Sequence, residues 1–125
     1  EVPSVIFLLP EYIKAGVQGI AIGTNDLAQL LLGVDRDEMP LNKRFHPTHP
    51  AILAALKKLI KTARKHNIPC SICGRATIDD PELIEHLIIW GITAISTELE
   101  AIPATYGAIA RIEKRLLLEM ARKRI

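Results

Sequence analysis

The sequence predicts an α/β fold with parallel strands, and three observations support this. Short apolar segments that read as strands alternate with longer amphipathic segments that read as helices. The strand segments are apolar throughout, as in GIAIG, which is typical of strands covered on both faces. Polar residues follow directly where these strands end, which is where parallel α/β proteins bind ligands.

The first third of the chain reads as one complete β-α unit with a partial one before it. The opening EVPS reads as the end of a strand that begins upstream. A helix is predicted over Val5–Lys14 and is closed by Gly16. A strand over Gly19–Gly23 follows, and then a short helix over Asp26–Leu32 that ends at Gly33.

The remaining elements repeat the same order. A long polar connection over Val34–Pro50 indicates a functional loop. Next come a helix over Pro50–His66, with its proline at a tolerated position, and a strand over Ile68–Gly74. A helix that starts at Asp79-Asp80-Pro81-Glu82 and runs to about Trp90 is predicted next, because a carboxylate N-cap, a proline in the first turn and further negative charge are a strong start signal. The apolar stripe of the Pro50 helix is expected to be Ile52, Leu56, Leu59, Ile60 and Ala63.

The last strand is predicted over Ile92–Thr97 and the last helix over Ile102–Lys123. The apolar residues of this helix are expected to face inward, namely Ile102, Tyr106, Ile109, Leu116, Leu117 and Met120. Right-handed crossovers place the parallel strands side by side with the helices outside. A free three-stranded parallel sheet has bare edges, whereas eight such units close into a barrel. We therefore expect the C-terminal half of a TIM (β/α)8 barrel, with a small doubly wound sheet as the alternative.

Composition narrows the class of protein. The 125 residues are 49% hydrophobic and 24% charged with a net charge of +2, which is ordinary for a globular domain and argues against a dedicated nucleic-acid binder. No apolar run approaches the roughly 20 residues of a membrane span. Two cysteines and no basic leader favour a reducing cytoplasm. Because the chain lacks a starting Met, we expect residues 1–125 to be a single piece of a longer protein.

Four positions should meet at the carboxyl ends of the strands: Glu1, Thr24-Asn25-Asp26, Cys73-Gly74-Arg75 and Thr97-Glu98. Two carboxylates with waters and substrate oxygens commonly hold Mg²⁺, so Glu1 and Asp26 could do so. Alternatively, Asp26 is only the N-cap of the helix that follows, and Glu1 is a frayed terminus. Asn25 could orient a ligand oxygen, or it could occupy a turn with positive φ.

The cysteines form a C-x-x-C pair, but a redox pair or half a zinc site fits poorly. Positions three apart on a strand face opposite sides, and there is no second cysteine pair. Cys70 is expected to be buried, whereas Cys73 beside Gly74 could act as an acid or base. The histidines show no metal-binding spacing. Arg36, between Asp35 and Asp37, either forms a local ion pair or lies near an anionic substrate.

Three motifs in order, EVPS, GTNDLAQLLLGVDRDE and SICGRATIDDPEL, resemble the C-terminal barrel of the phosphoenolpyruvate-utilising enzymes. The resemblance covers essentially the whole chain. It implies that Glu1 and Asp26 bind Mg²⁺, that Asn25 contacts substrate, and that Cys73 handles the proton at the substrate methylene. Gly23, Thr24 and Arg36 complete the substrate-binding set that we predict.

Within that family, LGVDRDE and DDPEL are like the branch that converts pyruvate, ATP and water into phosphoenolpyruvate, AMP and phosphate. A phosphohistidine would supply the phosphoryl group to the pyruvate enolate. The dikinase branch tends to carry a Gly-Gly segment after the Cys-Gly pair, which is absent here. The dikinase, the phosphotransferase-system branch, another enolate-forming enzyme and a non-catalytic half-barrel remain alternatives.

Two departures from the family pattern stand out. Arg75 replaces the usual Gln or Glu, and Thr97–Ala101 lacks the expected Asn-Pro-Asp-like turn. The phosphohistidine domain, the ATP-binding domain and the phosphoryl-binding arginines of the family have no counterpart in these 125 residues. We therefore expect the chain alone to be inactive. Its bare sheet edges lead us to expect self-association as a homo-oligomer.

Overall fold

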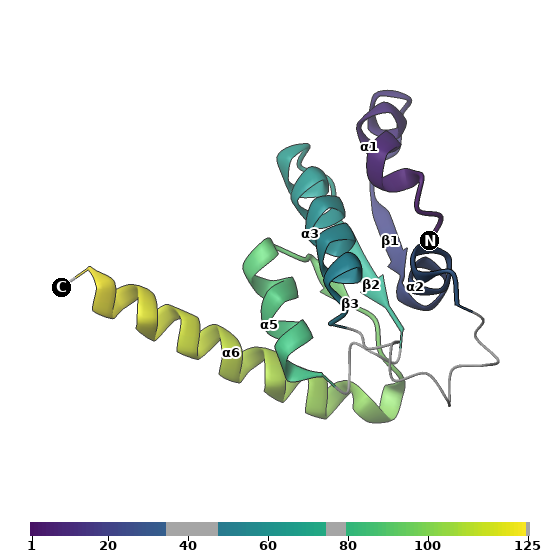
Figure 1. Cartoon of the computed structure of the whole chain (residues 1–125). Helices are drawn as coiled ribbons and strands as arrows, with labels where there is room; N and C mark the ends of the chain where they lie inside the picture. The colour runs from purple at the N-terminus through teal and green to yellow at the C-terminus, as the bar shows by residue number, and fades with distance from the viewer. Residues whose placement is uncertain (35–47, 75–79, 125) are drawn as a thin grey trace.

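A computed structural model of the chain describes residues 1–34, 48–74 and 80–124 (Figure 1). In these ranges it contains five α-helices, three strands and one 3₁₀ turn. The helices are α1 (Val5–Lys14), α2 (Thr24–Leu32), α3 (Pro50–Lys65), α5 (Pro81–Trp90) and α6 (Ile102–Lys123), and the 3₁₀ turn is η2 (Leu99–Ala101). The strands are β1 (Ile20–Gly23), β2 (Cys70–Cys73) and β3 (Ala94–Ile95). The predicted alternation of strands and helices is confirmed.

The three strands are parallel and lie in the order β1-β2-β3. Ile22 is in register with Ile72, and Ile72 with Ile95. β3 is shorter than the predicted Ile92–Thr97, although backbone bonds continue its pairing with β2 at both ends. The Thr93 amide donates to the Cys70 carbonyl at 2.9 Å, and the Ser96 amide donates to the Ile72 carbonyl at 2.8 Å.

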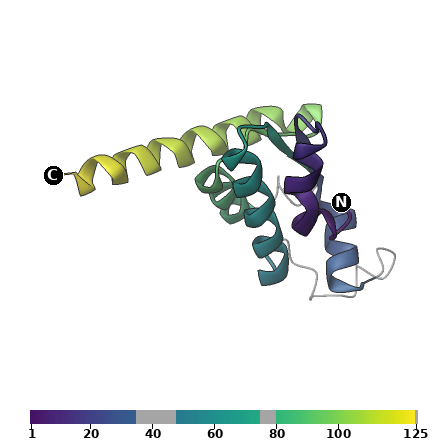
Figure 2. The same ribbon diagram turned by 90° about the horizontal axis from the view of Figure 1, so that it is seen from above.

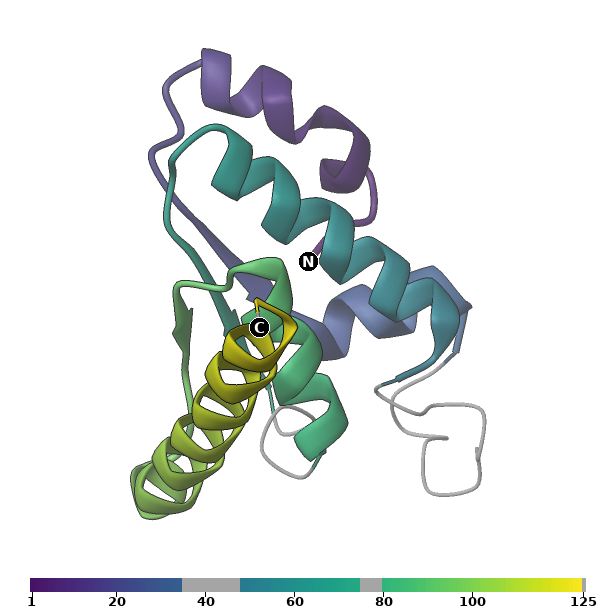
Figure 3. The same cartoon turned by 90° about the vertical axis from the view of Figure 1, so that its left-hand side faces the viewer.

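Helices cover only one face of the described sheet. Ile22, Cys70 and Ile72 are buried in one cluster with side chains of α1, α3 and α5, whereas Ala21 and Ala94 are exposed. Figure 3 shows the strands with α1, α3 and α5 on one side of them. Strands that are added in one direction by right-handed crossovers keep their helices on one side. Within the described residues, Gly19–Gly23 is covered on one face only, and helices on a single face do not support the doubly wound alternative.

The core is built around α3, which contacts α1, α2, α5 and β2. Leu56, Ile60 and Ala63 of α3 have no exposed surface, and Ile52 and Leu59 are buried with them. The predicted stripe of this helix is confirmed. Figure 2 shows α3 in the middle of the helical layer. Leu9 of α1, Leu27 of α2 and the two α5 leucines, Leu83 and Leu87, complete the core.

The helix starts agree with the sequence at α5 and differ at α2. Asp80 Oδ1 accepts from the amides of Glu82 (3.0 Å) and Leu83 (3.3 Å), so the predicted cap of α5 is confirmed. At the other helix, Gly23 is the N-cap and α2 begins at Thr24. Asp26 therefore lies inside the first turn and does not cap the helix. Asn25 lies in the same turn, so the alternative of a positive-φ turn is wrong.

The last helix has the predicted bounds, but most of its apolar side chains are exposed. Tyr106 is 74% exposed, Leu117 67% and Met120 57%. The helix packs on α5, where Arg115 pairs with Glu85, and its C-terminal half extends away from the rest of the molecule (Figures 1 and 2). The predicted inward stripe is therefore wrong for these positions. Nowhere in the described ranges is a helix both long and apolar enough to cross a membrane.

Candidate active site

The carboxyl ends of β1 and β2 meet at one level of the sheet. Gly23 is the register partner of Cys73, and α2 begins at the very next residue, Thr24. The Thr24 hydroxyl donates a hydrogen bond of 2.9 Å to the Cys73 carbonyl. The predicted convergence of these two strand ends is confirmed.

The side chain of Glu1, the first residue of the chain, lies at the carboxyl end of β1. A Cβ built on Gly23 would lie 3.0 Å from Glu1 Oε2. Register partners in a parallel sheet point to the same face, so this direction at Gly23 matches that of the Cys73 side chain. The Glu1 carboxylate and the Cys73 thiol thus share the uncovered face at neighbouring strand ends.

The two cysteines lie on opposite faces of β2, as predicted. Cys70 is 1% exposed, and burial raises its thiol pKa to about 11 because the thiolate would lose its hydration. Cys73 is exposed, and its thiol donates to the Ile22 carbonyl at 3.5 Å. Both are free cysteines, so no disulfide joins them.

Asn25 and Asp26 lie in the first turn of α2, beside the Cys73-Gly74 corner. Asn25 is half-buried, and its Oδ1 would lie 3.7 Å from a Cβ at Gly74, whereas Asp26 is exposed. The unpaired amides of a first helical turn favour anionic groups. Thr97 and Glu98 follow the third strand: the Thr97 hydroxyl is buried without a hydrogen-bond partner in the described residues, and Glu98 is exposed.

The donor set suits a hard cation better than a transition metal. No group of three or more His, Cys, Asp or Glu side chains that could hold a metal occurs in the described ranges. Mg²⁺, however, commonly takes only one or two protein carboxylates and keeps water or substrate oxygens as its other ligands. Glu1 lies beside Gly23 at the end of β1 and Asp26 in the first turn of α2, and their role as Mg²⁺ ligands stays a prediction. The predicted Arg36, and Arg75 with its departure from the family pattern, lie outside the described residues.

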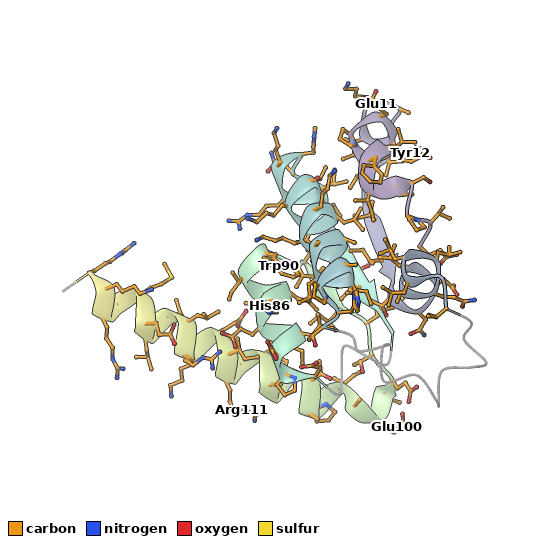
Figure 4. The ribbon with its side chains drawn as sticks, viewed as in Figure 1. Glu11, Tyr12, His86, Trp90, Glu100 and Arg111 are labelled. Carbon is orange, nitrogen blue, oxygen red and sulfur yellow. The ribbon has the colours of Figure 1, made fainter. Side chains whose placement is uncertain are left out.

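Other polar groups that sequence reasoning considered have structural roles. His49 Nδ1 accepts from the Ala51 amide at 3.1 Å and caps α3. His86 stacks on Trp90 of α5 with ring centroids 5.2 Å apart (Figure 4). A shallow hollow of about 330 Å³ on the open sheet face is lined by Gly19, Ala21, Pro69 and Ser71 among others. It lies toward the strand starts, away from the site.

Sequence reasoning missed the connection between Thr24 and Cys73. It assigned Thr24 to substrate binding, which stays a prediction; in the structure the residue is 6% exposed and its hydroxyl donates to the Cys73 carbonyl. It also missed Thr93, whose hydroxyl accepts from the Cys70 amide at 3.0 Å. The only local signal was a threonine directly after a strand, which is common in many turns.

Comparison with known proteins identifies the family. Residues 1–114 match the family described as PEP-utilising enzyme, PEP-binding domain. The chain belongs to this family. Among curated relatives, phosphoenolpyruvate synthase of Aeropyrum pernix is 43% identical over 121 residues, and that of Helicobacter pylori 40% over 116 residues. A probable phosphoenolpyruvate synthase of Methanocaldococcus jannaschii is 35% identical over 123 residues.

The matched region is a small part of those relatives. The alignments cover 95%, 93% and 98% of this chain but only 15%, 14% and 10% of the three relatives, in the same order. The family resemblance predicted from the three motifs is confirmed. The three parallel strands with their helices are consistent with part of a PEP-binding domain.

Proposed function

We propose that this chain forms one wall of the pyruvate/phosphoenolpyruvate site of a phosphoenolpyruvate synthase. The reaction would convert pyruvate, ATP and water into phosphoenolpyruvate, AMP and phosphate. The observation that carries the proposal is the shared position of the Glu1 carboxylate and the Cys73 thiol on one sheet face at neighbouring strand ends. The names of the relatives support the choice of branch.

In this proposal Glu1 and Asp26 hold Mg²⁺. Bound there, the ion would neutralise charge on the substrate carboxylate and on the oxygen that becomes the enolate. Asn25, in the first turn of α2, orients a substrate oxygen with its carboxamide. Gly23 leaves room for the Glu1 carboxylate at the strand end, because a Cβ at this position would lie 3.0 Å from Glu1 Oε2.

Cys73 handles the proton at the reacting carbon. Its side chain lies on the open face, accessible to a ligand, while Cys70 on the opposite face is enclosed by helices. In the direction of synthesis the Cys73 thiolate removes a methyl proton from pyruvate, and in reverse the thiol returns it. The enolate oxygen then takes the phosphoryl group from a phosphohistidine on another domain, a step that depends mostly on positioning and charge neutralisation.

The remainder of the site would come from outside this chain. Within residues 1–34, 48–74 and 80–124, one face of the sheet is uncovered and the outer edges of β1 and β3 pair with no further strand; the other strands of a TIM (β/α)8 barrel would cover these surfaces. This chain is then the C-terminal half of that barrel. Because phosphoryl transfer also needs the ATP-binding and phosphohistidine domains, the isolated chain is inactive in this proposal.

Substituting Cys73 in the full-length gene product tests the proposal. Cys73→Ala should slow exchange of the pyruvate methyl protons by about 10²–10⁴-fold, because the acid-base group is lost. ATP-dependent phosphorylation of the histidine should continue, since it takes place on other domains. Exchange is followed by NMR loss of the methyl signal in deuterium oxide, and histidine phosphorylation by transfer of labelled phosphate.

Cys70→Ala is the matched control, because it removes the same side chain from the opposite face of the same strand. It should leave the exchange rate near that of the unsubstituted protein. Retained exchange in Cys73→Ala, or loss of exchange and histidine phosphorylation together, contradicts the role assigned to Cys73. A gene that encodes no ATP-binding or histidine-bearing domain would rule out the synthase.

A further inference from the structure

We propose that the Thr24 hydroxyl is a positioning group for Cys73, and that it holds the Cys73-Gly74 corner against the end of β1. The inference rests on the proposed function in one respect, namely that Cys73 moves the substrate proton. It assigns to the Thr24 side chain a role other than contact with substrate.

The Thr24 hydroxyl extends the hydrogen bonding between the two strands beyond their last register pair. The last register pair of β1 and β2 is Gly23 and Cys73, and the chain turns into α2 at Thr24. No further strand residue of β1 is present to pair with the Cys73 carbonyl. The Thr24 hydroxyl donates to that carbonyl at 2.9 Å, from a side chain that is 6% exposed. Such a bond fixes the corner, since breaking it would leave a carbonyl without its partner.

Gly74 provides the space for this bond. Its φ is +129°, a conformation that side chains rarely adopt, and a Cβ built on it would overlap Thr24 Oγ1. The hydroxyl therefore occupies the volume that only glycine leaves free. Thr24 and Gly74 are complementary in shape, so a larger residue at position 74 would displace the hydroxyl.

The carbonyl and the thiol of Cys73 are bonded to the start of α2 and to β1, respectively. Its carbonyl accepts from the Thr24 hydroxyl, and its thiol donates to the Ile22 carbonyl at 3.5 Å. The thiol thus keeps a defined direction on the face that it shares with the Glu1 carboxylate. Proton transfer to a bound substrate depends steeply on such placement, because a misplacement of about 1 Å can cost about 10²-fold in rate.

Thr24→Val and Thr24→Ser in the full-length gene product separate positioning from substrate contact. Valine keeps the buried shape but loses the hydroxyl, so the turnover number of methyl-proton exchange should fall about 10–100-fold. The KM for pyruvate should stay within about twofold, because Asn25 and the metal-binding carboxylates are unchanged. Serine keeps the hydroxyl and should restore most of the rate.

A second measurement does not depend on turnover. The rates at which iodoacetamide alkylates Cys73 and Cys70 are followed by peptide mass spectrometry. Thr24→Val should raise the Cys73 rate by about threefold or more, because the corner opens locally, and should leave Cys70 unreactive. In Thr24→Ser, Cys73 should be alkylated at the same rate as in the unsubstituted protein.

Three outcomes would overturn the proposal. Unchanged exchange and alkylation in Thr24→Val would mean that the hydrogen bond does not position Cys73. Faster alkylation of both cysteines would mean that Thr24 stabilises the whole domain, and a raised KM alone would make it a substrate contact. If the unsubstituted protein shows no exchange but the alkylation pattern holds, the proposed function fails while the positioning role of Thr24 stands.

Discussion

The two faces of the described sheet differ more than the strand sequences suggest. Cys70 and Cys73 are the same residue type, three positions apart on β2. Cys70 is 1% exposed under the helices, and its amide and carbonyl are both bonded to Thr93. Cys73 is exposed at the end of the strand, beside Gly74. Because successive side chains alternate between the two faces of a strand, the position along β2 decides which cysteine lies in the core and which one is accessible for chemistry.

Within the four residues of β2, one face contributes to stability and the other to the proposed function. The helix-covered face carries Cys70 and Ile72, both in the hydrophobic core. The open face carries Ser71 and Cys73 and forms the proposed site with Glu1. Substitutions on the covered face should change the free energy of unfolding, and those on the open face should change reactivity.

The largest effect is expected for Ile72→Ala. Ile72 has no exposed surface, so the substitution should lower the free energy of unfolding by about 3 kcal/mol through lost burial and a residual cavity. Ser71→Ala, one residue away on the open face, should change it by less than about 0.5 kcal/mol. Urea unfolding followed by circular dichroism measures both. Equal losses would contradict the assignment of the two faces.

A smaller loss of free energy of unfolding is expected at high pH, where the Cys70 thiol ionises. Its folded-state pKa is raised from 9.0 to about 11, so both states are protonated below pH 9 and the stability is unaffected there. As the pH rises from 9 through about 11 the unfolded thiol ionises first, and the free energy of unfolding should fall by up to about 2 kcal/mol.

Urea unfolding at a series of pH values between 8 and about 11 isolates this contribution. The fall should be reduced in Cys70→Ala, which has no thiol in the core, and should persist in Cys73→Ala. Identical pH profiles for the two variants would mean that burial of Cys70 does not perturb its ionisation.

The smallest change in the free energy of unfolding is expected for α6, because most of its apolar side chains are exposed. Leu117 is 67% exposed, so Leu117→Ser should change the free energy of unfolding by less than about 0.5 kcal/mol. It should nevertheless weaken the self-association predicted for this chain, because it removes exposed apolar surface. Light scattering over a concentration series measures this. A chain that is monomeric at high concentration before substitution would contradict the prediction of self-association.

Features set by nearby residues were predicted well. The bounds of α1 and α6 match the predicted ranges, and Asp80 caps α5 as its carboxylate and the following proline indicated. The three motifs identified the family. The start of α2 was wrong by two residues, because Gly23 caps that helix without a side-chain bond and leaves no sequence signal. The metal-binding role of Glu1 and Asp26 stays a prediction.

The sequence by itself determined the order of strands and helices and the end of the sheet at which the chemical groups gather. It could do so because side-chain period, helix caps and strand direction depend on neighbouring residues. Only the tertiary structure decided that one face of the sheet is uncovered, that the apolar side of α6 is exposed, and that the Thr24 hydroxyl bonds Cys73. Thr24 and Cys73 lie 49 residues apart, and a contact over that distance arises only when the strands pair.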